Sequence, residues 1–231
     1  LPLPGSTEYL YALCPDGAGG AWLLCGSLPK GYFDAFGNFR FLSQEPEGKL
    51  ALAHYDAAFA LQEIVLLQTL YTDRFFQLRR LDGGFCMMSA SLLVRLDETG
   101  TEKALRSVDA KDGWSFAAMQ ETDGVLYALT RNLYGIELPE LRKFTPDTLS
   151  ALESDVCTSE ITGLGLRADG RLLMGNSEEL FAYDTGSGET ETLVRWQEIG
   201  ANVLTEQPWE LEDGYLLFSP GDTSLQRLRR V

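Results

Sequence analysis

The sequence predicts an all-β fold, specifically a β-propeller of five four-stranded blades whose ring is closed by the N-terminal segment. Two repeated sequence markers and their shared spacing favour this fold. Intervals of 40 to 50 residues are typical of one four-stranded propeller blade. An incomplete propeller or a six-bladed one is the alternative.

The first marker is an Asp-Gly pair that precedes a short apolar run. It occurs five times, and its last three intervals are 41, 46 and 44 residues. Asp and Gly accept the positive φ angles of a tight turn, so each pair is expected to join two antiparallel strands. The pairs are Asp16-Gly17, Asp82-Gly83, Asp123-Gly124, Asp169-Gly170 and Asp213-Gly214.

The second marker lies downstream of each Asp-Gly pair. It consists of Leu, any residue, a polar or small residue and a large apolar residue, and its copies are 41, 48, 39 and 45 residues apart. In three copies an Asp follows. Because two independent markers keep the same period, we expect five repeats. The copies begin at Leu52, Leu93, Leu141, Leu180 and Leu225.

Apolar runs bounded by turn residues predict the strands of each repeat. In the first two repeats they are 8–13, 21–26, 49–55 and 60–67, then 74–80, 84–89, 92–97 and 102–108. In the next two they are 114–120, 125–130, 140–145 and a short strand before Asp155, then 161–167, 171–175, 179–184 and 191–195. The fifth repeat offers only 204–211, 215–219 and 224–231. Residues 1–5 are therefore expected to supply its outer strand, which removes an exposed sheet edge.

Composition and charge restrict the class of protein. A 231-residue chain with 45% apolar residues can bury one core, so residues 1–231 are expected to form a single domain. The net charge of −15 opposes binding to nucleic acid and to anionic lipid. No apolar run reaches 18 residues, so no membrane insertion of this segment is expected. The four cysteines lack zinc-site spacing and are expected to be buried, unpaired thiols.

Two repeats are longer than the others between their second and third strands. The distance from Asp-Gly to the second marker is 11 or 12 residues in three repeats, 18 in the third and 36 in the first. The extra residues lie at about 27–48 and 131–139. Connections of this kind share one face of a propeller, so both insertions are expected on the same face, where function usually resides in repeat proteins.

The first insertion is rich in aromatic residues, which are unusual in a loop and indicate a binding surface. The candidate ligand-binding residues are Tyr32, Phe33, Phe36 and Phe39, together with Tyr134 in the second insertion. The alternative is that the first insertion folds into an extra hairpin that caps the disc and buries its rings.

The sequence assigns no catalytic residue, metal site or cofactor. His54 is the only histidine, and it occupies the position held by Arg95, Lys143, Ala182 and Arg227 in the other repeats, so it is expected on a sheet surface. Oxygen-rich loops such as the one after Asp184 lack the spacing of a calcium loop. The alternative function is a glycan-active hydrolase or lyase that uses carboxylates in the central funnel. Its candidates are Asp73, Glu121, Glu160 and Glu206.

Short motifs carry a resemblance to a known family. The segment 16–24, the run Leu193-Val194-Arg195-Trp196, the run Gly200-Ala201-Asn202-Val203, the Leu-Pro-Leu-Pro opening and the Arg-rich end resemble the N-terminal β-propeller domain of Firmicutes surface lipoproteins that also carry a solute-binding-type domain. The resemblance implies an extracellular location, with a cell-surface anchor outside this fragment; a cytoplasmic location is the alternative.

Together these observations favour a non-catalytic binding or interaction module over an enzyme. Its partner is expected to be a small molecule, a glycan or a protein, and the domain itself is expected to be monomeric. A structural spacer that presents a neighbouring domain is a further hypothesis.

Overall fold

The computed structural model describes residues 9–26, 31–33, 39–41, 50–69, 71, 73–108, 112–153, 155–157, 160–199, 207–219 and 224–229. Across these residues the regular structure is β-strand, apart from 3-10 turns such as η2 (Trp196–Ile199). The chain folds as two compact units, Leu1–Arg106 and Ser107–Val231. None of the described segments forms a helix with the length and apolar character needed to cross a bilayer.

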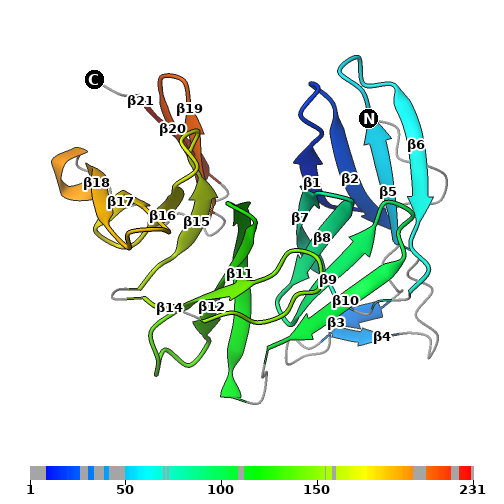
Figure 1. The fold of residues 1–231 in the computed structure, drawn as a ribbon, viewed down its shortest axis with the longest axis horizontal. Helices are drawn as coiled ribbons and strands as arrows, with labels where there is room; N and C mark the ends of the chain where they lie inside the picture. Colours follow the sequence, from blue (N-terminus) through cyan, green and yellow to red (C-terminus); the bar gives the residue numbers. More distant parts are fainter. Residues whose placement is uncertain are drawn as a thin grey trace. The chain divides into compact units, whose positions relative to one another are not determined.

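The first unit contains two four-stranded antiparallel sheets, ordered β1-β2-β5-β6 and β7-β8-β9-β10 (Figure 1). Strands that are adjacent in each sheet follow one another along the chain, apart from the excursion between β2 and β5, where β3 pairs with β4. The strands are β1 (Tyr9–Pro15), β2 (Ala21–Gly26), β3 (Gly31–Phe33), β4 (Phe39–Phe41), β5 (Leu50–Tyr55), β6 (Leu61–Leu66), β7 (Phe75–Leu81), β8 (Gly84–Ser89), β9 (Leu92–Asp97) and β10 (Glu102–Ser107).

The second unit repeats the same plan with sheets β11-β12-β13-β14, β15-β16-β17-β18 and β19-β20-β21 (Figure 1). The strands are β11 (Trp114–Thr122), β12 (Val125–Asn132), β13 (Glu140–Phe144), β14 (Asp155–Val156), β15 (Gly163–Leu166), β16 (Leu172–Gly175), β17 (Glu179–Tyr183), β18 (Thr190–Arg195), β19 (Gln207–Leu211), β20 (Gly214–Ser219) and β21 (Ser224–Arg229). These bounds confirm the predicted all-β repeats. The predicted outer strand at 1–5 lies outside the described residues.

The Asp-Gly pairs lie where the sequence predicts, between the first and second strands of each sheet. Asp123 and Gly124 have φ angles of 52° and 71°, the two positive values that a two-residue type I′ hairpin requires. The turn between β19 and β20 is shifted by one residue, because Gly214 already pairs with Leu211. The hairpins differ in length: two residues separate the paired strand ends in the second, third and fifth of these sheets, and five residues separate them in the first and fourth.

A second set of turns explains why Asp follows the second marker in three repeats. At the connection from the third to the fourth strand, one carboxylate oxygen accepts hydrogen bonds from two backbone N–H groups. Asp56 accepts from Ala58 and Ala60, Asp97 from Thr99 and Thr101, and Asp184 from Gly186 and Ser187, at 2.8–3.0 Å. The side chain satisfies amides that the turn leaves unpaired.

These turn carboxylates are expected to make the fold less stable in acid. The Thr99 hydroxyl that donates to Asp97 holds the pKa of that carboxyl below its usual value, and the Ser187 N–H has the same effect on Asp184. A pKa lowered by folding stabilises the folded state above the unfolded pKa of about 4, and this contribution is lost as the pH falls through the folded pKa. We expect the urea midpoint to fall between pH 5 and pH 2. The fall should be shallower in Asp97→Asn and unchanged in the exposed control Glu153→Gln; equal slopes in the wild type and Asp97→Asn would contradict this origin.

The sheets pack face to face, and their middle strands are the most deeply buried. Every residue of β8 and β16 is buried, but β10 and β18 contain no buried residue. In the first unit, β1 lies against β7, and one core joins the first two sheets. In the second unit, β11 lies against β15 and β15 against β19, and two cores join the third, fourth and fifth sheets. Burial on both faces of the middle strands is what radially packed propeller blades produce.

Contacts between hairpins show that the sheets of the second unit point the same way. The Thr122 hydroxyl at the end of β11 donates to the Gly170 carbonyl in the next hairpin, at 2.8 Å. The Ala168 N–H in that hairpin donates to Glu210 of β19, at 2.9 Å. The first hairpins of the three sheets therefore lie at one end of the unit, and the connections from second to third strands leave from the opposite end.

Gly165 in β15 tests this packing, because β19 passes directly over it. A Cβ atom at this position would lie 2.0 Å from the Pro208 carbonyl oxygen. Since the obstacle is backbone, Gly165→Ala should push the two strands apart and lower the free energy of unfolding by about 2 kcal/mol in urea denaturation. In the control Gly186→Ala the new Cβ would meet only an ordinary contact at 3.4 Å, so its stability should stay near wild type. Equal stabilities of the two variants would show that β15 and β19 are not in contact.

The cysteine predictions are confirmed in part. None of the four cysteines, all within the described residues, forms a disulfide. Cys14 pairs across the first hairpin with Trp22. Three thiols are buried, but Cys157 is only half-buried, so the expectation of four buried thiols is wrong at that position. Burial raises the pKa of the Cys14 thiol to about 11, which keeps it protonated at neutral pH.

Candidate functional site

The predicted aromatic site in the first insertion is described only in its backbone. Tyr32 and Phe33 lie in β3 and Phe39 lies in β4, and Phe33 pairs directly with Phe39. The insertion therefore contains the extra hairpin that the alternative interpretation required. Phe36 lies outside the described residues, and so do the side chains of the other three. Ligand binding by this cluster stays a prediction.

Tyr134 lies in the second insertion, within a loop that presents apolar side chains to solvent. Four large apolar residues occur within six consecutive positions, and each is 47–78% exposed. They are Leu133, Tyr134, Ile136 and Leu138. Isolated exposed apolar residues are common, but a contiguous group indicates an interaction site.

The base of this loop is held in place. The Leu133 N–H donates to the Gly113 carbonyl at 2.8 Å, and the Asn132 side-chain oxygen accepts from the Tyr134 N–H at 3.0 Å. Asn132 also donates through its side-chain amide to the Asp112 carbonyl at 3.2 Å. The loop is thus a turn held by hydrogen bonds at its base, where the Tyr134 ring also lies against Gly113.

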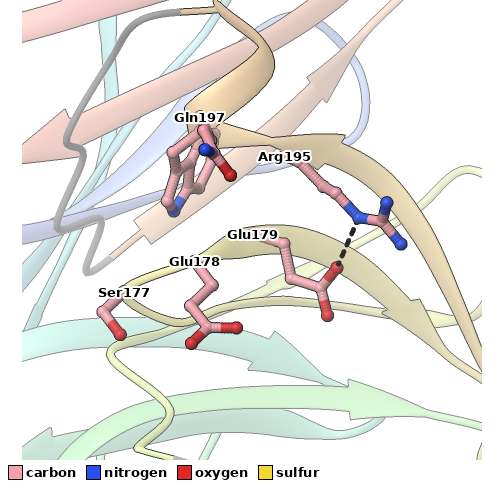
Figure 2. Close-up of a pocket in the computed structure, with 6 residues that line it drawn as sticks. Ser177, Glu178, Glu179, Arg195 and Gln197 are labelled. Carbon is pink, nitrogen blue, oxygen red and sulfur yellow. Dashed lines mark ion pairs between the residues drawn. The ribbon is translucent and has the colours of Figure 1, made fainter.

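A pocket of about 460 Å³ opens beside the fourth sheet (Figure 2). Figure 2 shows the carboxylates of Glu178 and Glu179 on one side and Arg195 on the other, with an ion pair of 4.0 Å between Arg195 and Glu179. The lining residues are Ser177, Glu178, Glu179, Arg195, Trp196 and Gln197. The pocket therefore offers hydrogen-bond donors and acceptors of both charge signs beside an indole ring.

The pocket wall is fixed by Asn176 and Trp196. The Asn176 side-chain oxygen accepts the N–H groups of Glu178 and Glu179, each at 2.8 Å, and so shapes the turn that enters β17. The Asn176 carbonyl accepts the indole N–H of Trp196 at 2.8 Å, and the Trp196 N–H donates to the Glu178 carbonyl at 2.9 Å. Trp196 is only 2% exposed, so η2 is locked onto the turn.

The apolar loop and the pocket lie at the same end of the second unit. Arg131, at the end of β12, donates from its guanidinium to the Thr162 carbonyl before β15. Thr162 in turn donates its N–H to the Gly175 carbonyl at the end of β16, at 2.7 Å, next to the pocket turn. Within this unit the structure supports the prediction that connections from second to third strands share one end.

The candidate catalytic carboxylates occupy different places. Asp73 accepts hydrogen bonds from the hydroxyls of Ser89 and Ser91 in the first unit. In the second unit, Glu121 accepts the N–H of Gly124 at the hairpin end of β11, at 3.2 Å, but Glu160 precedes β15 at the opposite end. Glu206 lies outside the described residues. Asp73 is thus bonded to serine hydroxyls in the first unit, and Glu121 and Glu160 lie at opposite ends of their sheets in the second.

The expectation that His54 occupies a sheet-surface position holds only in part, because its side chain is 24% exposed. At the equivalent position of the other repeats, Arg95 is 4% exposed and Ala182 is fully buried. His54 itself stacks on Trp22, with 4.5 Å between ring centroids, and its Nε2 lies 2.9 Å from Asp16 Oδ2. The position lies on a middle strand and is covered to a different degree in each sheet, since Lys143 is also half-buried. The hydrogen bond with His54 also lowers the pKa of Asp16.

Sequence reasoning missed the pocket. Arg195 and Trp196 enter the sequence analysis only through the family resemblance. The connection from the second to the third strand of the fourth repeat has the normal length, so no insertion points to the pocket. The available signal was Asn176, a single polar residue placed directly after the buried strand β16. Among the residues that the structure describes, no group of three His, Cys, Asp or Glu side chains is placed to hold a metal ion.

Comparisons with known proteins support the fold. No family model and no curated protein matches the sequence. Among solved structures, a protein of unknown function from Bacteroides caccae is similar with a TM-score of 0.58 at 12% identity, over 99% of this chain and 80% of that one. Virginiamycin B lyase from Staphylococcus aureus has a TM-score of 0.51 at 8% identity, over 96% and 84%. The computationally designed Ika8 protein has a TM-score of 0.56 at 11% identity over 98% of this chain, which spans 60% of its length. At these identities the likeness shows the fold alone, which is all-β and propeller-like.

Proposed function

We propose that this chain is a non-catalytic binding or interaction module that contacts its ligand through the apolar loop at residues 133–138. The observation that carries the proposal is the exposure of Leu133, Tyr134, Ile136 and Leu138 on an insertion that the repeat does not need. Burying four such side chains against a partner would stabilise a complex by about 1.5–3 kcal/mol for each one fully covered. The partner is a small molecule, a glycan or a protein.

The nearby pocket supports binding by adding polar specificity. Its guanidinium, carboxylates, amide and hydroxyl can orient a ligand that the apolar loop holds. Catalysis by funnel carboxylates has less support, because Glu121 and Glu160 lie at opposite ends of their sheets. A glycosidase needs two carboxyl groups about 5–10 Å apart.

The same proposal includes a single domain over residues 1–231 with five blades in one closed ring. The sheets of the first four repeats have four strands each, and the sheet of the fifth repeat, β19-β20-β21, has three. One further strand would complete it. Residues 1–5 are our candidate for that strand. We also propose the cell-surface location that the family resemblance implies.

A ligand screen with matched variants tests this function. Wild-type protein would be screened against glycan and peptide arrays and by thermal shift against small metabolites. Any hit would then be titrated with Leu133→Ser/Ile136→Ser and with Leu152→Ser, which removes an exposed leucine outside the loop. The proposal expects at least a tenfold loss of affinity in the loop variant and wild-type affinity in the control. Full affinity in the loop variant, or turnover of the bound ligand by the wild type, would refute it.

A further inference from the structure

The pocket beside the fourth sheet gathers charged groups of both signs that the protein itself leaves weakly paired. The Arg195 guanidinium lies 4.0 Å from the Glu179 carboxylate and 3.8 Å from the Glu198 carboxylate, too far for a hydrogen bond in either case. The Glu178 carboxylate has no hydrogen bond or ion pair with any residue that the structure describes. A cation and an anion that line the same cavity in this way can each bind a ligand group of the opposite sign.

The backbone around these side chains is fixed by the fold. Glu179 and Arg195 lie directly opposite each other in β17 and β18. The Glu178 N–H donates to Asn176 Oδ1 at 2.8 Å, and the Glu178 carbonyl accepts the Trp196 N–H at 2.9 Å. Since a fixed backbone leaves less to be ordered when a ligand binds, the entropic cost of binding is lowered.

We propose that this pocket binds a small zwitterion with an apolar side chain, that is, a free amino acid or a short peptide. Its carboxylate pairs with the Arg195 guanidinium and its ammonium group pairs with the Glu178 carboxylate, which Figure 2 shows on the other side of the cavity. The apolar loop at residues 133–138 lies at the same end of the second unit and offers a surface for the apolar side chain. The inference rests on the proposed binding function, because it names the class of ligand that the module accepts.

The charges of the pocket select against ligands of a single sign. A ligand with only a carboxylate would also face the carboxylates of Glu178 and Glu179, and a ligand with only an ammonium group would also face Arg195. Like charges placed together cost binding free energy, so a ligand that carries both signs is preferred. The net charge of −15 further lowers the local concentration of free anions. The volume of about 460 Å³ lies in the range of small-ligand sites.

Calorimetric titration of the whole chain tests the ligand class. The probes are leucine, phenylalanine and the dipeptides Leu-Leu and Leu-Phe, and their relative affinities distinguish an amino acid from a peptide. The wild type should bind at least one of them and should bind its N-acetylated form and its C-terminal amide at least tenfold more weakly. Unchanged affinity for either capped form, or no binding of any of the four probes at millimolar concentrations, would overturn the proposal.

Two variants test which side chain recognises which end of the ligand. Arg195→Gln should bind the free acid as weakly as the wild type binds the amide, and it should no longer distinguish the two. Glu178→Gln should likewise cease to distinguish the free amine from its acetylated form. A side chain with a purely structural role would not remove this discrimination selectively. The exposed controls Arg106→Gln and Glu153→Gln should discriminate as the wild type does. Wild-type discrimination in Arg195→Gln or Glu178→Gln would overturn the assignment.

Failure of this inference and failure of the proposed function give different results. If the wild type binds none of the zwitterions but binds another ligand that Leu133→Ser/Ile136→Ser does not bind, the loop function stands and the pocket assignment falls. If Arg195→Gln and Glu178→Gln lose affinity for a zwitterion that the loop variant binds as tightly as the wild type, the pocket assignment stands and the loop function falls.

Discussion

Replacing Trp196 with alanine is expected to lower the free energy of unfolding by about 4 kcal/mol. The indole is 2% exposed and packs in the core between the fourth and fifth sheets, with Leu173, Leu180 and Tyr215 among its neighbours. Its removal leaves a large cavity and also leaves the Asn176 carbonyl without its indole donor. Urea denaturation followed by circular dichroism measures the change.

Two further variants separate the causes of this effect. Trp196→Phe keeps most of the apolar volume but not the N–H group, so it should cost less than the alanine variant. Trp209→Ala removes a tryptophan that is 38% exposed, and its cost should be clearly smaller than that of Trp196→Ala. If Trp196→Ala destabilised the protein by less than 1 kcal/mol, η2 would not be part of the core and the pocket would lack a fixed wall.

Replacing Arg95 with methionine is expected to cost about 3 kcal/mol, because charge-assisted hydrogen bonds contribute about 1.5–3 kcal/mol each. The guanidinium is buried and donates to the carbonyls of Phe85, Leu96 and Asp82. Methionine keeps much of the aliphatic packing of the stem but removes these charge-assisted hydrogen bonds from a buried site. The change is measured by urea denaturation at pH 7.

Lys143→Met is the matched control for Arg95, because it changes the equivalent position of the third repeat. Lys143 is only half-buried, so its replacement should change stability by less than 1 kcal/mol. Similar losses for the two variants would show that the repeat position has one common role. We expect instead that each sheet uses this position differently: for backbone hydrogen bonds at Arg95, ring stacking at His54 and close packing at Ala182.

Most of the fold could be predicted from local sequence. Asp123 and Gly124 fix a turn through their own φ angles, and alternating turns and apolar runs then define where β11 and β12 begin. Asp97 marks the next turn because its carboxylate bonds to amides only two and four residues away. Interactions of such short range can be recognised without knowing the rest of the structure.

The candidate site could be predicted only where the repeat lengths differ. The insertion containing Tyr134 was found because it lengthens one connection. The pocket was not found, since it depends on a contact between Asn176 and Trp196, 20 residues apart. The partial burial of His54 could not be predicted for the same reason: burial at that position is set by the groups that pack over the strand, such as Trp22, and not by the residue types that occupy it.

Closure of five blades by residues 1–5 is tested most directly by amide hydrogen exchange in β21. The amides of β21 that point toward β20 should be protected through that pairing in any case. If residues 1–5 form the outer strand, the remaining amides of β21 should also be protected in the full chain and should lose this protection when residues 1–5 are deleted, with β18 unchanged as the control. Identical exchange of β21 in the two chains would contradict ring closure by the N-terminal segment.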